Sequence, residues 1–357
     1  MSLVFDNVSF TVRGQQWIAP TSLSLAHASL NVLLGPTLSG KTTLMRLMAG
    51  LDVPTSGRIL FDGKDVTGIP VRHRNVAMVY QQFINYPSLS VYENIASPLR
   101  VKGLPKAEIE ARVSKAAKLL KLEPYLTRLP LELSGGQQQR TAIARALVKE
   151  AGLVLLDEPL ANLDYKLREE LREELPRIFA ESGAIFVYAT TEPSEALLLG
   201  GKTATLHQGH VTQFGPTIDV YRHPADSNTA QVFSDPPMNF ASATLSGKSL
   251  TLQDGTKLAT DGLPALKPGD YQIGFRPNHT TIHASKKLQS IKARVGVSEI
   301  TGSESFIHVE ACGARWIALE PGVHELKPGS AINIYLDPSR FFVFSSDGRL
   351  VAAPKES

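Results

Sequence analysis

The chain has 357 residues, more than one ordinary hydrophobic core accommodates, so we expect two domains. Hydrophobic residues make up 43% and charged residues 20%, proportions typical of a globular protein. The formal net charge of +3, without a long run of Lys or Arg, gives no indication of a nucleic-acid partner. The single cysteine, Cys312, excludes an internal disulfide and is expected to be a small buried residue.

The apolar stretches of the sequence predict no membrane-spanning helix. Residues 153–156 and 196–199 are among the longest of them, and both fall far short of the roughly 20 residues that a span needs. The amino-terminal residues lack the charged start and apolar core of a signal peptide. We therefore expect any role at a membrane to depend on partner chains.

Residues 1 to about 235 predict an α/β domain built on a parallel sheet. A strand over 30–34 is followed by a glycine-rich turn and a helix over 41–49. Two further continuous apolar runs, 153–156 and 184–188, are typical of parallel strands that are covered on both faces.

Helical patterns interrupt this domain. Between the last two strands, the charged segment 163–179 predicts a helix that Pro176 is expected to kink or break. Residues 88–150 are mostly helical in pattern, with helices expected over 106–122 and 134–149. We interpret them as a helical subdomain inserted into the sheet.

Residues 236–357 predict a small antiparallel β-barrel of OB type. Short apolar segments at 271–275, 305–310 and 331–336 are separated by Gly, Pro and Asp turns. The predicted fold is therefore an α/β phosphate-loop ATPase core with a helical insertion, followed by a barrel domain.

A glycine-rich loop follows the strand 30–34 and fits the phosphate-loop pattern. Its two glycines let successive backbone N–H groups point at one anion, and the helix that follows adds the positive end of its dipole. We expect Lys41 to reach the β- and γ-phosphates of ATP, and the Thr42 hydroxyl to bind Mg²⁺. The nucleotide-binding candidates in this loop are Gly35, Pro36, Thr37, Leu38, Ser39, Gly40, Lys41, Thr42 and Thr43.

Two acidic residues, Asp157 and Glu158, end the apolar strand 153–156. A carboxylate at the carboxyl end of a strand, beside a phosphate loop, is suited to hold Mg²⁺. We expect Asp157 to do so, and Glu158 to orient and activate the attacking water as a general base.

A second glycine turn opens the expected helix 134–149 and offers a second anion site. Its sequence resembles the signature of ATP-binding-cassette (ABC) ATPases and consists of Leu133, Ser134, Gly135, Gly136 and Gln137. In that family two subunits pair head to tail, and each ATP lies between one phosphate loop and the partner's signature. The resemblance implies that Ser134, Gly135, Gly136 and Gln137 act on the partner's nucleotide.

Further stretches, in the same order along the chain, resemble the same family. Gln81 matches the glutamine that contacts Mg²⁺ and the water and senses the permease. Residues 85–91 match the stretch that lines the permease docking groove, and 160–164, ending in Asp164, match a loop that crosses the dimer interface. Residues 274–279 resemble a Gly-Ile-Arg-Pro-Glu-His segment of ATPases in maltose- and glycerol-phosphate-type importers.

The resemblance implies the ATPase subunit of a bacterial importer for a small carbohydrate or polyol. Its expected cofactors are ATP and Mg²⁺. Its expected partners are a second ATPase subunit, identical or different, two permease subunits and, indirectly, a periplasmic substrate-binding protein. The expected location is the cytoplasmic face of the inner membrane, and the barrel is expected to enlarge the dimer interface or to regulate the ATPase.

The sequence departs from the family pattern at two positions. Thr191 stands where the family has a histidine that contacts the γ-phosphate, and Val12 stands at the adenine-stacking position, with Phe10 and Trp17 nearby. Losing one preorganised phosphate contact lowers a rate by about 10²–10³-fold. Three alternatives follow: a transporter subunit paired with a different ATPase, a homodimer that tolerates Thr191, and a catalytically weak regulatory subunit. A non-transport ABC ATPase is a further alternative, although such proteins usually carry two cassettes or a long coiled-coil insertion.

Overall fold

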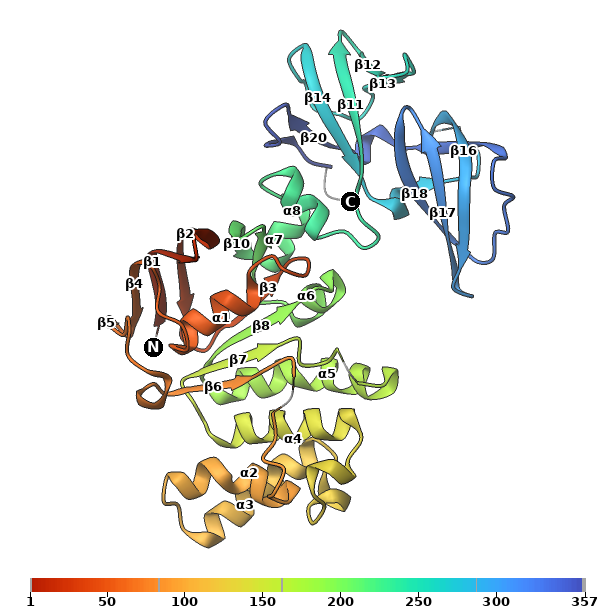
Figure 1. Cartoon of the computed structure of the whole chain (residues 1–357). Helices are drawn as coiled ribbons and strands as arrows, with labels where there is room; N and C mark the ends of the chain where they lie inside the picture. Colours follow the sequence, from red (N-terminus) through yellow and green to blue (C-terminus); the bar gives the residue numbers. More distant parts are fainter. Residues whose placement is uncertain (1, 83, 162, 287, 355–357) are drawn as a thin grey trace. The chain divides into compact units, whose positions relative to one another are not determined.

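The computed structural model describes residues 2–82, 84–161, 163–286 and 288–354. The chain divides into two compact units, Met1–Thr217 and Ile218–Ser357, each of which is described by itself (Figure 1). Within the described residues, no helix is long and apolar enough to cross a membrane.

The first unit opens with an antiparallel sheet that the sequence did not predict. Its strand order is β2-β1-β4-β5. The strands are β1 (Ser2–Val12), β2 (Gln15–Ala26), β4 (Ser56–Phe61) and β5 (Lys64–Asp65). Buried residues alternate with exposed ones in β2 and with partly buried ones in the first half of β1, as expected for a sheet with one face on a core.

The predicted parallel sheet forms the centre of the first unit, with the order β10-β9-β3-β8-β7-β6. Strands β9, β3, β8, β7 and β6 pair in parallel, while β10 pairs antiparallel to β9 at one edge. The strands are β3 (Leu30–Leu34), β6 (Val76–Val79), β7 (Leu153–Asp157), β8 (Ile185–Thr190), β9 (Lys202–His207) and β10 (His210–Pro216). The strands expected over 30–34, 153–156 and 184–188 are thereby confirmed.

Helix α1 (Lys41–Ala49) matches its predicted bounds and packs into the core between the two sheets. Leu44, Met45, Leu47 and Met48 are all essentially inaccessible to solvent, since α1 presents apolar residues at helical spacing. The phosphate loop is consequently anchored to a rigid core at both of its ends.

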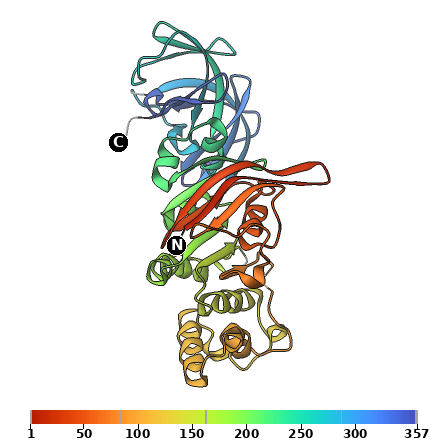
Figure 2. The same cartoon turned by 90° about the vertical axis from the view of Figure 1, so that its left-hand side faces the viewer.

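The helical insertion consists of α2 (Val91–Val101), α3 (Lys106–Leu119) and α4 (Gly135–Val148). These helices pack on one another and lie together at one end of the first unit (Figures 1 and 2). Helix α3 ends three residues before the predicted Leu122, and Leu122 instead adjoins the short 3-10 turn Glu123–Tyr125.

Helix α5 (Tyr165–Ser182) runs through Pro176 without ending, so the proline does not break the helix, and the alternative of a kink stays a prediction. The buried side chains of Leu171, Leu175 and Phe179 lie on both sides of the proline. Their burial stabilises the helix across this position, because tertiary packing outweighs local propensity. Helix α6 (Pro193–Leu199) follows β8.

The second unit is predominantly antiparallel sheet, as predicted. One sheet has the order β13-β12-β11-β14-β20-β21, and the other has the order β15-β19-β16-β17-β18. Both contribute to a single core, which includes Phe275, Trp316 and Phe341. The strands are β11 (Asn239–Ser246), β12 (Ser249–Leu252), β13 (Lys257–Ala259), β14 (Gly269–Phe275), β15 (Thr280–Thr281), β16 (Gln289–Ile300), β17 (Glu304–Ala311), β18 (Ala314–Pro321), β19 (Ala331–Leu336), β20 (Phe342–Ser345) and β21 (Leu350–Ala352).

The predicted boundary at residue 235 falls inside the second unit. Helices α7 (Thr217–Arg222) and α8 (Ser227–Val232) precede it and bond to the barrel. Arg276 donates a hydrogen bond to the Tyr221 carbonyl and stacks on the Tyr221 ring at 3.7 Å. Ala230 of α8 belongs to a small buried cluster with Met238, Phe342 and Phe344. These contacts place α8 and Tyr221 of α7 with the barrel, while Thr217, the first residue of α7, bonds to Thr203 and Gly200 of the first unit.

Candidate active site

The carboxyl ends of neighbouring strands β3, β7 and β8 bring the predicted catalytic segments together, as expected at one edge of a parallel sheet. The phosphate loop follows β3, the Asp157–Glu158 pair ends β7, and Thr190–Thr191 ends β8. The backbone N–H of Glu158 donates to the Ala189 carbonyl at 3.0 Å, which fixes the two acidic residues against β8.

The phosphate loop needs both of its glycines. A Cβ on Gly35 would lie 2.5 Å from the Leu206 carbonyl oxygen, and Gly40 has a φ of 106° directly before helix α1. Leu38 also has a positive φ, of 66°, and is 84% exposed at the tip of the loop. The hydroxyl of Ser39 is buried without a hydrogen-bond partner among the described residues. A loop that curls tightly and leaves a buried polar atom unpaired is suited to receive a phosphate.

Lys41 is 5% exposed and points back over this loop. Its Nζ donates to the carbonyl oxygens of Gly35, at 2.7 Å, and Pro36, at 3.1 Å, and lies 3.7 Å from Glu158 Oε1. Burial lowers the pKa of Lys41, while the nearby carboxylates of Glu158 and Asp157 oppose that shift. The ammonium group is thus held at the loop, where a phosphate would find a cation already desolvated.

Thr42 and Asp157 lie in direct contact, as a shared metal site requires. The Thr42 Oγ1 donates to Asp157 Oδ2 at 2.7 Å, and Asp157 is 2% exposed. Burial raises the pKa of the Asp157 carboxyl, because the charged form loses solvation. A hydroxyl and a carboxylate oxygen are hard ligands of the kind that Mg²⁺ binds, so these two residues fit the ion.

Glu158 and Gln81 are also brought together. Gln81 Nε2 donates to Glu158 Oε2 at 2.9 Å, although the two residues are far apart in sequence. The other carboxylate oxygen of Glu158 faces Lys41, so this side chain links the phosphate loop to the segment that follows β6. Glu158 itself has a φ of 47°, a conformation that non-glycine residues adopt rarely and mostly at functional positions.

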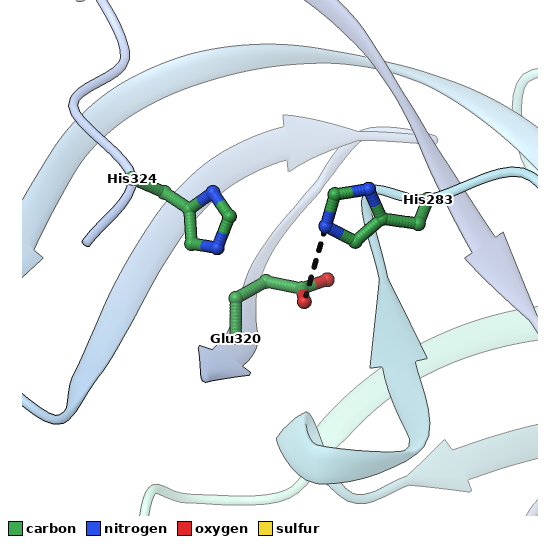
Figure 3. Close-up of side chains that lie close together, drawn as sticks. All are labelled: His283, Glu320 and His324. Carbon is green, nitrogen blue, oxygen red and sulfur yellow. Dashed lines mark ion pairs between the residues drawn. The ribbon is translucent and has the colours of Figure 1, made fainter. Parts of the chain in front are cut away.

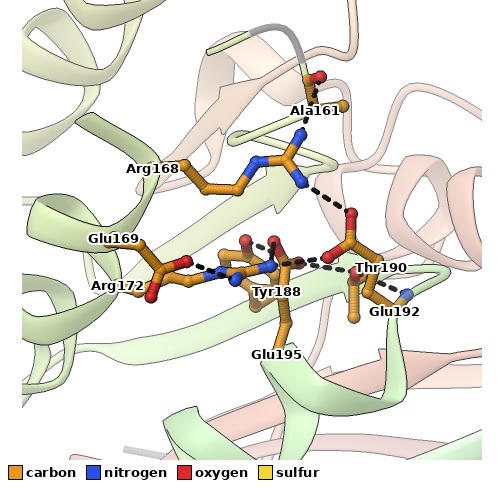
Figure 4. Close-up of polar contacts among 8 residues, drawn as sticks. All are labelled: Ala161, Arg168, Glu169, Arg172, Tyr188, Thr190, Glu192 and Glu195. Carbon is orange, nitrogen blue, oxygen red and sulfur yellow. Dashed lines mark hydrogen bonds and ion pairs between the residues drawn. The ribbon is translucent and has the colours of Figure 1, made fainter. Parts of the chain in front are cut away.

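Thr191 is exposed, directly after the buried Thr190. A polar network holds the backbone next to Thr191 in place, and Figure 4 shows its residues from β8, the β8–α6 turn and α6. Thr190 Oγ1 donates to Glu195 Oε2 at 2.6 Å, and the Glu192 N–H donates to Thr190 Oγ1 at 3.0 Å. The Tyr188 hydroxyl donates to the same Glu195 oxygen at 3.0 Å.

Two arginines of α5 complete this network and were not predicted as site residues (Figure 4). Arg172 pairs with Glu192 at 2.5 Å and with Glu195 at 3.2 Å. Arg168 pairs with Glu192 at 3.0 Å and donates to the Ala161 carbonyl at 3.2 Å. The turn that carries Thr191 is thereby tied to the 160–164 loop. Only the charge of the segment 163–179 hinted at these contacts in the sequence.

The signature residues lie at the start of α4. Ser134 is exposed and caps the helix: Ser134 Oγ accepts from the Gln137 N–H, and Gln137 Oε1 accepts from the Ser134 N–H at 3.0 Å. Gly135 is exposed beside it, so backbone N–H groups at this helix start face solvent. Gln139 connects the helix to the catalytic segment, since its Nε2 donates to the Pro159 carbonyl.

The loop expected to dock on a permease is fixed by the helical insertion. The side chain of Asn94 in α2 accepts from the Tyr86 N–H at 2.8 Å and donates to the carbonyls of Tyr86, Leu89 and Ser90. Arg145 of α4 stacks over the Tyr86 ring at 4.9 Å, while the ring itself is exposed. This segment is therefore a rigid surface feature.

The expected adenine-stacking residue and the two aromatic residues near it lie on strands β1 and β2. Val12 is exposed at the end of β1, Phe10 packs against the core, and Trp17 is partly exposed in β2. Asp164 is exposed directly before α5, while Asn162 of the same loop lies outside the described residues. Val12 and Asp164 remain predictions as nucleotide contacts.

Comparison with known proteins gives a consistent result. The ABC transporter family model matches residues 18–161, and the TOBE domain model matches residues 273–344. The sn-glycerol-3-phosphate import ATP-binding protein of Paracoccus denitrificans is 35% identical over 96% of both chains. The corresponding protein of Brucella suis is 35% identical over 98% of this chain and 99% of its own. This chain belongs to the ABC transporter ATP-binding proteins.

A solved structure supports the same assignment for the first unit. The ATP-binding cassette MJ0796, determined as a dimer bound to ADP and Pi, is 29% identical with a TM-score of 0.56. The match covers 60% of this chain and 98% of that one. The expected fold class is thus confirmed for this family member: an ATPase core with a helical insertion, followed by a TOBE-type antiparallel barrel.

Proposed function

We propose that this chain hydrolyses ATP to power an importer of sn-glycerol 3-phosphate or a related small carbohydrate or polyol. The observation that carries the proposal is the convergence of Lys41, the Thr42–Asp157 pair and the Glu158–Gln81 pair at one edge of the parallel sheet. Lys41 supplies a cation for the phosphates, Thr42 and Asp157 supply metal ligands, and Glu158 supplies a base for the attacking water. Phosphoryl transfer to water requires these parts.

The chain's own residues have distinct roles in this proposal. Residues 35–43 hold the phosphates through backbone N–H groups and Lys41, and Thr42, Asp157 and Gln81 hold Mg²⁺, which would neutralise charge on the phosphate oxygens. The Glu158 carboxylate orients the attacking water and accepts its proton. Ser134, Gly135, Gly136 and Gln137 close the nucleotide site of a partner subunit, since their exposed helix start offers donors outward.

The partners follow from the exposed features of the first unit. We propose that residues 85–91 receive a helix of a permease subunit, and that Gln81, close to this segment, reports nucleotide state to it. The assembled transporter contains two permease subunits. A second ATPase subunit pairs head to tail with this one. The chain then lies on the cytoplasmic face of the membrane, held there by its partners, and a periplasmic binding protein delivers the substrate to the permeases.

Thr191 supports a more specific arrangement, in which the second ATPase subunit is a different chain. A threonine hydroxyl reaches less far than imidazole and carries no charge, so the composite site that uses Thr191 would hydrolyse slowly. The partner's site would then carry most of the turnover. A homodimer that compensates for Thr191 is the alternative.

The test is to tag this chain, purify it from native membranes in mild detergent, and identify the proteins that accompany it. We expect two permeases and a second ATPase chain. Permeases without a second ATPase chain would support the homodimer, and no permease in a preparation shown to preserve the complex would contradict transport. Proteoliposomes of the purified complex, supplied with binding protein, should take up labelled sn-glycerol 3-phosphate in an ATP-dependent manner.

Catalysis by this subunit is tested in the same complex with Glu158→Gln. We expect ATP turnover to fall sharply in a homodimer, because the base is lost from both sites while the hydrogen bond from Gln81 is retained. In the heterodimer, where the partner's site carries most of the turnover, we expect a smaller fall. Glu181→Gln, an exposed position on α5, is the matched control and should leave turnover unchanged. Unchanged turnover in Glu158→Gln would mean that this subunit's own site is dispensable.

A further inference from the structure

A cluster of two histidines and one glutamate lies in the second unit, outside the ATPase core. His283 follows strand β15, Glu320 is in strand β18, and His324 is in the loop after β18 (Figure 3). Among the described residues, these three form a group that could hold a metal ion, since one potential ligand atom from each lies within 4.8 Å of the others.

The geometry of the cluster is compact. His283 Nε2 lies 4.0 Å from Glu320 Oε2, and the two imidazole rings are 5.7 Å apart between centroids at an angle of 63°. Figure 3 shows both rings turned toward the glutamate carboxylate from opposite sides. An ion between them would be approached by an oxygen and two nitrogens.

Glu320 is 3% exposed, which is unusual for a carboxylate that is not paired or bound to a metal. Its Oε1 accepts from the Ile282 N–H at 2.5 Å, so that oxygen is fixed by the backbone beside His283. Its Oε2 faces His283. Burial and a backbone hydrogen bond hold the carboxylate in one orientation, as is common for a ligand whose position must be fixed.

His324 is held in a similar way. Its backbone N–H donates to Ser305 Oγ at 2.9 Å, and its Nε2 lies 2.9 Å from the Pro321 carbonyl oxygen. A carbonyl can only accept, so the hydrogen is on Nε2 and the lone pair is on Nδ1. This hydrogen bond to a carbonyl is the support that metal-binding histidines usually have.

We propose that His283, Glu320 and His324 bind one divalent transition-metal ion of the zinc type. Two imidazole nitrogens and one carboxylate oxygen are ligands typical of Zn²⁺, whereas Mg²⁺ and Ca²⁺ prefer oxygen ligands throughout. With three protein ligands, the remaining coordination position is open to water or to a fourth group. The site is separate from the Mg²⁺ pair Thr42–Asp157, which lies in the first unit.

Metal binding would join two loops of the barrel. One is the segment after β15, which contains His283, and the other is the segment after β18, which contains His324. The same ion would neutralise the buried Glu320 carboxylate. We expect binding to lower the mobility of both loops without changing the sheets that carry them.

The test uses the purified full-length chain without nucleotide, stripped of metal, and measures Zn²⁺ binding by equilibrium dialysis with elemental analysis. We expect one site per chain that His283→Gln, His324→Gln and Glu320→Gln each weaken by roughly tenfold or more. His308→Gln is the matched control, because His308 pairs with Glu299 at 3.3 Å but is not part of the three-residue group. The control should bind as the unsubstituted chain does.

Two further measurements separate the proposal from adventitious binding. Hydrogen exchange should show Zn²⁺-dependent protection at 282–286 and 322–326 in the unsubstituted chain and in His308→Gln only. Co²⁺ should give a visible spectrum of low coordination number, lost in His283→Gln. Absence of a stoichiometric Zn²⁺ site, or a site unaffected by the three substitutions, would overturn the proposal and leave an ordinary His–Glu ion pair.

Discussion

Asp157 is almost fully buried, and its burial raises the pKa of its carboxyl above the ordinary value. The folded chain therefore binds this proton more tightly than the unfolded chain does. The resulting stability is present at low pH and is lost as pH rises through the raised pKa. At neutral pH the charged carboxylate destabilises the nucleotide-free fold, and bound Mg²⁺ would remove that penalty.

Asp157→Asn should consequently stabilise the nucleotide-free chain at neutral pH, by on the order of 1 kcal/mol, while abolishing Mg²⁺-dependent hydrolysis. Asparagine removes the charge and still accepts from the Thr42 hydroxyl. The measurement is urea unfolding at pH 7 and at pH 4, with a smaller gain expected at pH 4. Asp270→Asn is the control, because Asp270 accepts from Thr244 at 2.7 Å on the exposed surface and should show little gain. Equal gains in both variants would contradict the explanation.

Thr191→His should raise ATP turnover of the assembled complex, by up to about 10²-fold if this site limits the rate. The reason is that imidazole supplies the phosphate contact that threonine lacks. Ser194→His places the same side chain at a nearby exposed position and should not change turnover. No change in Thr191→His would mean that Thr191 is not a defect.

The sequence predicted most of the residues at this site because their chemistry depends on short, contiguous motifs. Lys41, Thr42, Asp157 and Glu158 lie where strands end, and the structure brings them together as parallel strands require. Arg172 could not be predicted in this way. It pairs with Glu192 in the β8–α6 turn and with Glu195 in α6, which are both distant in sequence. The local sequence of a charged helix does not show whether an arginine on it is buried or solvated.

At the scale of an element, α5 holds the β8–α6 turn through its buried arginine. Arg172→Met should destabilise the first unit by about 3–5 kcal/mol, because Glu195 would keep a buried charge without its partner. Arg177→Met is the control on the same helix, since its pair with Glu181 is exposed and contributes little. Urea unfolding measures both variants.

The double variant Arg172→Met with Glu195→Gln should recover part of the loss, because the unpaired charge is removed as well. A cost for Arg172→Met as small as that for Arg177→Met would contradict a structural role for the network. Helix α5 also illustrates why Pro176 does not break the helix, one of the two outcomes expected, the other being a kink. Local propensity penalises proline, but the buried leucines and Phe179 on both sides bind the helix to the core.

Asn94 of α2 holds the 85–91 segment in place, as Arg172 holds the β8–α6 turn. Asn94→Leu should cost about 2 kcal/mol, because it removes the partner of several partly buried backbone groups of this segment. Hydrogen exchange over 85–91 should become faster, and the permease-coupled ATPase should fall while the isolated chain keeps its own rate. Ser97→Ala, one turn along α2, is the control, since the Ser97 hydroxyl donates to the Asn94 carbonyl within the helix. Unchanged exchange in Asn94→Leu would contradict the assignment.

At the scale of the whole molecule, the two units have separate hydrophobic cores. We expect calorimetry to resolve two unfolding transitions rather than one. A non-hydrolysable ATP analogue with Mg²⁺ should raise only the transition of the first unit, and Zn²⁺ only that of the second, because each ligand binds one folded unit. A single transition raised by either ligand would show that the units unfold together.

The boundary between the units shows the limit of composition as a guide. The sequence pattern changes from helical to strand-like near residue 235. Residues of α7 and α8, which precede this point, nevertheless pack with the barrel. Similarly, the antiparallel sheet of β1, β2, β4 and β5 was not predicted, because β4 pairs with β1 from beyond the phosphate loop and helix α1. Both depend on pairing between distant segments, which a single sequence does not display.

Cys312 is the one cysteine of the chain and is buried in the barrel core. Burial raises the pKa of its thiol to about 11, so the reactive thiolate is scarce at neutral pH. Thiol-directed dyes and spin labels should therefore leave the native chain largely unmodified. A cysteine introduced at an exposed residue such as Ser134 or Leu38 would accept a probe without prior removal of Cys312. Labels at such positions would allow fluorescence energy transfer or pulsed electron paramagnetic resonance measurements. These would report the distance between the phosphate loop of one subunit and the signature of its partner as nucleotide binds and is released.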